Sequence, residues 1–157
     1  MRRFAEGTTV STEKSKAEIE GTLRRYGATG FISGWEENRA FLAFKIAERQ
    51  VKFILTLPDP ADRKFTHTPG RGNRRTIEDA HREWEAGCRQ SWRSLALVIK
   101  AKLEAVSAGI TIFEDEFMAH IVLPDGKTVG YHARPMIESA YATGKMQPLL
   151  PHYGGNA

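Results

Sequence analysis

The sequence contains a single cysteine, Cys88, and this excludes an internal disulfide. No stretch approaches the roughly 20 consecutive apolar residues that a helix needs to span a bilayer. The first residues, Met1-Arg2-Arg3-Phe4, are not followed by an apolar run, so no signal peptide is indicated. These absences lead us to expect a cytoplasmic protein with no membrane partner.

A large excess of one charge is also missing. The 157 residues hold 23 lysines and arginines against 19 aspartates and glutamates, which gives a net charge of +4 at pH 7. Proteins that coat DNA carry a denser positive field, so the distribution of charge is more informative here than its total. Neither an internal repeat nor a break in composition divides the chain, and a single domain over residues 1–157 is predicted.

Apolar periodicity predicts an α+β fold. Residues 29–35, 40–47 and 51–57 are candidate strands, and short polar turns separate them. Apolar and polar side chains alternate over 51–57, whereas both alternating sets of 40–47 contain apolar residues, so both faces of that strand are expected to be partly covered. This pattern is typical of strands that form a three-stranded antiparallel meander.

A first helix is predicted ahead of the strands, over residues 11–26, where apolar side chains recur at helical spacing. Ser11 or Thr12 could cap its start. Ser15 and Glu18 match a capping box one turn later.

A second, long helix is predicted over residues 76–108. Thr76 is a suitable N-cap, and Gly109 closes the apolar stripe. Gly87 inside this helix costs about 1 kcal/mol relative to alanine, and it predicts a bend or a close packing contact. A helix of this length could also supply the face of a homodimer.

The C-terminal third gives a weaker pattern. Residues 111–116 fit either a short strand or a helical turn, and a small hairpin is predicted over 120–131 around Pro124-Asp125-Gly126. A last helix is predicted from Pro135, as its first residue, to Thr143. Residues 145–157 are predicted to be an irregular tail.

Residues 58–75 interrupt the periodic pattern with three prolines and two glycines, which predicts a long irregular loop. The loop carries five basic residues and no acidic residue between positions 63 and 75: Arg63, Lys64, Arg71, Arg74 and Arg75. Arginine binds phosphate through two parallel hydrogen bonds, and a glycine lets backbone amides approach an anion closely. The loop therefore predicts binding of nucleic acid, either DNA or RNA. The alternative is a solvated loop whose charge only aids solubility.

Four more side chains, two on the long helix and two in the loop itself, are predicted to contribute to nucleic-acid binding. Arg89 and Arg93 share one side of the long helix and could extend the basic surface. Phe65 and His67 could stack on an unpaired base.

Acidic residues form one group with metal-like composition, Glu114-Asp115-Glu116 with His120 and Asp125 nearby. Carboxylates and histidine bind Mg²⁺ or Mn²⁺ in nucleases. Adjacent carboxylates diverge on a helix and on a strand, however, so no metal site is assigned. Cys88 lies in the apolar stripe of the long helix and is predicted to be buried in the core.

Three segments of the sequence resemble a family of small proteins encoded by phages, prophages and integrative mobile elements. These are residues 88–130 (CRQSWRSLALVIKAKLEAVSAGITIFEDEFMAHIVLPDGKTVG), residues 13–31 (EKSKAEIEGTLRRYGATGF) and the LPDP at 57–60. The resemblance implies a genetic setting. It carries over no activity, no cofactor and no catalytic residue.

The order of elements also resembles that of the double-stranded-RNA-binding domain, which has a helix, a three-stranded meander and a second helix that begins with basic residues. Arg71, Arg74 and Arg75 occupy the corresponding place. The loop motif that this domain carries between its first strands is missing, and Thr76-Ile77-Glu78-Asp79 replaces its lysine-rich helix start. The resemblance is therefore one of topology.

Three functions fit the sequence. The first is a non-enzymatic nucleic-acid-binding accessory protein of a mobile element. The second is a protein-binding modulator of a host or anti-phage defence protein, which should expose an apolar patch. The third is a metal-dependent nuclease that uses Glu114, Glu116 and His120.

Overall fold

The computed structural model describes residue 1 and residues 3–151. Three strands form an antiparallel sheet in the order β1-β2-β3: β1 (Gly30–Glu36), β2 (Arg39–Ile46) and β3 (Arg49–Thr56). The predicted α+β class and the meander are confirmed, and each strand begins or ends within about two residues of its predicted limits.

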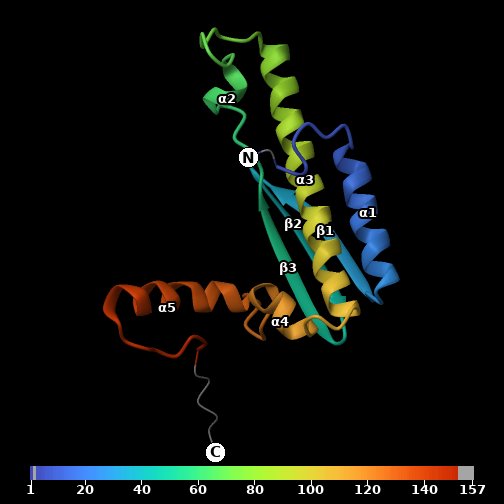
Figure 1. The fold of residues 1–157 in the computed structure, drawn as a ribbon, viewed down its shortest axis with the longest axis vertical. Helices are drawn as coiled ribbons and strands as arrows, with labels where there is room; N and C mark the ends of the chain where they lie inside the picture. Colours follow the sequence, from blue (N-terminus) through green and yellow to red (C-terminus); the bar gives the residue numbers. More distant parts are fainter. Residues whose placement is uncertain (2, 152–157) are drawn as a thin grey trace, which may run out of the picture.

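Two helices cover one face of this sheet (Figure 1). They are α1 (Thr12–Arg25) and α3 (Ile77–Ser107), which pack against each other as well as against the strands. No helix formed by residues 3–151 lies over the other face of the sheet (Figure 1).

Strand pairing places one set of alternating side chains in the core. Leu42 and Phe44 of β2 are buried, and they lie opposite Phe53 and Val51 of β3, which are buried too. The side chains between them point to the opposite face because successive residues of a strand alternate. Each strand therefore presents one set of alternating side chains to the helices and the other set to the open face of the sheet.

Helix α1 begins where the Ser11 hydroxyl accepts a hydrogen bond from the Lys14 amide at 3.1 Å. The capping box predicted at Ser15 is wrong, because Ser15 lies inside the helix and is completely buried. Ile19 and Leu23 follow it into the core at helical spacing.

Helix α3 confirms the long-helix prediction. The Thr76 hydroxyl accepts a hydrogen bond from the Asp79 amide at 3.1 Å, and Leu95, Ile99 and Leu103 are buried against the sheet. Cys88 is only partly buried, since the N-terminal third of α3 extends beyond the sheet, and the predicted core position for it is wrong.

The chain after α3 takes the helical one of the two alternatives predicted for residues 111–116. Residues after Gly109 form a short helix, α4 (Phe113–Phe117), and a 3₁₀ turn, η1 (Met118–His120). Phe117 is fully buried and meets Phe44 edge-on, with 5.9 Å between ring centroids, so α4 closes one end of the core.

The predicted small hairpin over 120–131 is present in a shorter form. Its two arms are joined by the Val122–Thr128 bridge and by hydrogen bonds from the Leu123 amide to the Lys127 carbonyl and from the Val129 amide to the Ile121 carbonyl. The second arm ends at Thr128, whose hydroxyl caps a helix by accepting from the Tyr131 amide. The first arm pairs with the sheet: Ile121 forms a bridge to Val51, and the Val122 amide donates to the Gln50 carbonyl at 2.8 Å.

The last helix, α5 (Val129–Thr143), therefore begins six residues earlier than predicted, and Pro135 lies inside it. Proline removes the amide that would bond to the carbonyl four residues before it, at Tyr131. Tyr131 is exposed, so water can reach this turn of the helix. Gly144 ends α5 in the left-handed conformation, as predicted.

Helix α5 projects from the body of the protein, and none of its residues is buried (Figure 1). Residues 145–151 contain no helix or strand, as predicted for the tail, and 152–157 lie outside the described residues. No helix in the described part of the chain combines the length and the apolar content that crossing a bilayer requires.

Candidate nucleic-acid interface

The basic segment, residues 63–75, is folded rather than irregular. It begins with a short helix, α2 (Arg63–Thr66), because the Asp62 carboxylate accepts a hydrogen bond from the Lys64 amide at 3.0 Å. The Phe65 side chain is buried and lies against Gly87 of α3, where a Cβ atom would be 3.0 Å from the Phe65 ring. Gly87 thus marks a close packing contact, which is one of the two features predicted for it.

The rest of the basic segment folds back on α2. The Thr68 amide donates to the Asn73 carbonyl and the Arg75 amide donates to the Thr66 carbonyl, both at 2.8 Å. Gly70 and Gly72 have φ angles of 80° and 67°, so they supply the left-handed backbone that this tight return needs. The prediction of an irregular loop is wrong because these local hydrogen bonds could not be read from composition.

Arg75 holds the segment together. Its Nη1 atom donates to three backbone carbonyls, those of Lys64 at 3.0 Å, Phe65 at 3.1 Å and His67 at 2.7 Å. These carbonyls lie at the end of α2, where a cation is favoured because the helix leaves its last carbonyls without amide partners. Arg75 therefore acts as an internal clip, with its Nη1 atom already occupied.

Three arginines of the segment remain exposed. Arg63, Arg71 and Arg74 form no ion pair with any residue that the structure describes. The Arg63 guanidinium lies beside the turn, because a Cβ atom at Gly72 would be 3.2 Å from its Nη2 atom. The Arg63 guanidinium therefore lies beside the turn that carries Arg71.

Lys64 is less available than these arginines. Its ammonium lies 3.6 Å from the Asp62 carboxylate and 4.9 Å from the centre of the Phe65 ring. An exposed pair of this kind is weak, so phosphate can compete for the lysine.

The structure does not bring Arg89 and Arg93 to the basic segment. Arg93 pairs with Glu18 and joins α3 to α1. Arg89 is partly buried, and it lies two residues after Gly87, where Phe65 of the segment packs on α3, so its side chain leaves the helix on a different side. The predicted extension of the basic surface along α3 is therefore not observed.

Neither predicted stacking residue is free to stack on a base. Phe65 is buried beneath α2, as described above. His67 is partly buried, and its Nδ1 atom lies 2.8 Å from the Thr66 hydroxyl.

The acidic residues named from the sequence do not converge. Glu116 pairs with Lys102 at 3.1 Å, Glu114 lies 3.8 Å from Arg49, and Asp125 lies 2.6 Å from His132. Across residues 1 and 3–151, no three histidine, cysteine, aspartate or glutamate side chains are arranged to hold a metal ion.

His120 has a structural position. Its ring stacks on Phe53 with 3.9 Å between centroids. Burial lowers the pKa of His120 below its ordinary value, and the nearby Lys102 ammonium lowers it further. A neutral ring suits this stacked position, because burial disfavours the charged form.

The open face of the sheet is a second exposed surface, and it was not predicted from the sequence. Ile32 of β1 and Ile54 of β3 are 63% and 58% exposed there. Lys52 shares the row of Ile32, and Arg39 and Lys52 line a hollow with Ile54. The signal was present in the sequence, because the residues that alternate with a buried set must face the other way.

No family model, curated protein or solved structure matches this chain, so no function is carried over from a relative.

Proposed function

We propose that this chain is a non-enzymatic nucleic-acid-binding accessory protein of a phage or mobile element, and that it binds phosphates through the basic segment. The observation that carries the proposal is the exposure of Arg63, Arg71 and Arg74 on a folded support with no carboxylate paired to them among the described residues. The genetic setting is supported by the sequence resemblance alone.

The arrangement suits a phosphate backbone for two physical reasons. A guanidinium binds phosphate through paired hydrogen bonds, and these are stronger than neutral ones. The Arg75 clip fixes the backbone that carries the other arginines, so less conformational entropy is lost on binding than for a mobile loop.

The proposal is tested by measuring binding of labelled single- and double-stranded DNA and RNA across a salt series. We expect the logarithm of the affinity to fall by about 0.7 to 0.9 per phosphate contact for each unit of log salt. The triple variant Arg63→Ala/Arg71→Ala/Arg74→Ala should lose about two to three units of this slope.

A matched variant separates local contact from net charge. Lys14→Ala/Arg25→Ala/Lys100→Ala also removes three positive charges, from exposed positions on α1 and α3. It should retain the salt slope of the wild type. Equal loss in both variants would show that only overall charge matters, and absence of binding at low salt would refute the proposal.

A second candidate function, a protein-binding modulator, is favoured by α5. This projecting helix exposes Tyr131, Ile137 and Tyr141, and Tyr141 is 90% exposed. Exposed apolar groups of this kind commonly mark protein contacts. If the chain binds a host protein through α5, Ile137→Ser/Tyr141→Ser should abolish that complex in a pull-down and leave nucleic-acid binding unchanged.

A further inference from the structure

The open face of the sheet carries apolar and basic side chains in adjacent rows. The strand register aligns Ile32, Ala43 and Lys52 in one row across the sheet. The next row aligns Gly34, Phe41 and Ile54.

Two further rows lie at the ends of this face. Lys45 occupies the centre of one, between Gly30 and Gln50, and Arg39 occupies the centre of the other, between Glu36 and Thr56. A line of side chains along β2 therefore runs from Arg39 past Phe41 to Lys45, with Lys52 beside it.

Phe41 lies flat on this face because Gly34 has no side chain. A Cβ atom at position 34 would be 2.6 Å from two atoms of the Phe41 ring, so the ring covers the glycine. An aromatic ring over a glycine protects the strand, and it also turns its second surface toward solvent. Phe41 is only partly buried, and the Lys52 ammonium lies 5.8 Å from the ring centre.

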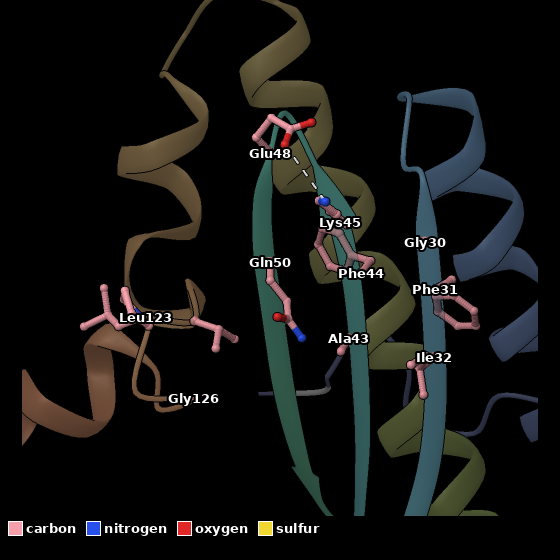
Figure 2. Close-up of a pocket in the computed structure, with 12 residues that line it drawn as sticks. Gly30, Phe31, Ile32, Ala43, Phe44, Lys45, Glu48, Gln50, Leu123 and Gly126 are labelled. Atoms are coloured by element: carbon pink, nitrogen blue, oxygen red, sulfur yellow. Dashed lines mark ion pairs between the residues drawn. The ribbon is translucent and has the colours of Figure 1, made fainter.

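The surface is hollowed on both sides of the Phe41 row. One hollow is lined by Phe41, Lys52 and Ile54, with Arg39 and Glu36 at its end. The other hollow lies between the strands and the turn that contains Leu123. Figure 2 shows this hollow, with the turn beside β3 forming one of its sides.

Three basic groups against two acidic groups favour an anionic partner on this face. Arg39 and Lys45 occupy the two end rows, and Lys52 lies between them. Each acidic group lies beside an end cation: Glu36 shares the row of Arg39, and Glu48 lies in the β2–β3 turn with its carboxylate 4.0 Å from the Lys45 ammonium. Lys52, beside the aromatic ring, has no ion-pair partner among the residues that the structure describes.

A single-stranded nucleic acid matches this combination. Its unpaired bases are flat and apolar on their faces, so they stack on aromatic rings, and its phosphates pair with nearby cations. The bases of a duplex are already stacked on each other and cannot reach a flat sheet. From Arg39 to Lys45 the strand covers about 20 Å, which is long enough for several nucleotides.

We propose that the open face of the sheet binds a single-stranded segment of nucleic acid, with an unpaired base stacked on Phe41 and the phosphates held by Arg39, Lys45 and Lys52. This inference rests on the proposed function and adds the strandedness of the ligand. The basic segment follows β3 and lies beyond the same end of the sheet as Arg39, so one strand could contact both surfaces (Figure 1).

The test compares a single strand of about 12 thymidine or uridine nucleotides with a duplex of the same length, by fluorescence anisotropy at low salt. Phe41→Ala and Lys45→Gln/Lys52→Gln should each weaken single-strand binding about tenfold. Both should change duplex binding less than twofold. Phe41→Leu keeps an apolar side chain over Gly34 and should also lose affinity, so a folding defect cannot explain the result.

Matched controls are available elsewhere on the surface. Tyr141→Ala removes an exposed aromatic ring from α5, and Lys14→Gln/Lys100→Gln removes two exposed cations from α1 and α3. Both control variants should keep the preference of the wild type for a single strand over a duplex.

The outcomes separate this inference from the proposed function. If the open-face variants bind single strands as the wild type does, while the basic-segment variant loses binding, the open face is not the site and the proposed function stands. If the open-face variants lose single-strand affinity and the basic-segment variant does not, the open face alone is the site. No binding of any probe by the wild type would refute both.

Discussion

Gly21 and Gly87 lie inside helices, yet their surroundings differ. A Cβ atom at Gly21 of α1 would meet nothing within 4 Å. A Cβ atom at Gly87 of α3 would be 3.0 Å from Cζ of Phe65 and 3.3 Å from Cγ of Pro58. Gly87 is therefore needed where α2 and its linker pack on α3, whereas Gly21 only lowers helix propensity.

This contrast predicts opposite effects of the same substitution. Gly21→Ala should raise the free energy of unfolding by about 0.5 to 1 kcal/mol, because alanine restricts the unfolded chain and favours a helix. Gly87→Ala should give no such gain, because crowding of Phe65 and Pro58 costs about 1 to 3 kcal/mol. Urea denaturation of the two variants checks this. Equal stabilisation would mean that α2 does not pack on α3 as described.

Side-chain direction is the part of the candidate site that the sequence could not reveal. The cluster of positive charge in the basic segment was visible as composition. The inward position of Arg75 depends on carbonyls eight to eleven residues away, and the pairing of Arg93 depends on Glu18, 75 residues away. Such partners are fixed only once the chain has folded.

At the scale of elements, the long helix and the three strands were predictable because each has a sustained period of apolar residues. The apolar stripe of the long helix and its N-cap residue Thr76 were enough to predict it. The bounds of the elements after Gly109 were harder to predict because they depend on other parts of the chain. Ile121 and Val122 pair with β3, and Thr128 is used as a helix cap, so the hairpin is limited to a single bridge. A turn sequence such as Pro124-Asp125-Gly126 predicts the turn and not the length over which its arms pair.

The basic segment is the element whose integrity depends most on one side chain. Arg75→Ala should remove a charged donor whose two Nη1 hydrogens are shared among three carbonyls, and a hydrogen bond to a charged group contributes a net of about 1.5 to 3 kcal/mol. We expect faster amide hydrogen exchange across residues 65–75 and little change in α1 or β2. Arg74→Ala is the matched control, since Arg74 is exposed and makes no such contacts. Equal exchange in both variants would argue against the clip.

At the scale of the whole molecule, the protein has one core with attachments at its two ends. The sheet, α1 and the middle of α3 share that core, and Phe117 of α4 belongs to it. The basic segment is attached at one end of α3, and α4 with α5 at the other (Figure 1). The sequence could predict the core because it is periodic. It could not predict that α5 would project, because an amphipathic helix shows a preferred face and not its partner.

The length of α3 has a consequence for any partner. Its 31 residues correspond to about 46 Å along the axis. The basic segment and α5 lie near opposite ends of this helix, so the length of α3 sets the distance between them. A ligand that touches both must extend over that distance, which for a DNA duplex is about 14 base pairs. A shorter ligand can occupy one end only, and the other end then stays available to a second molecule.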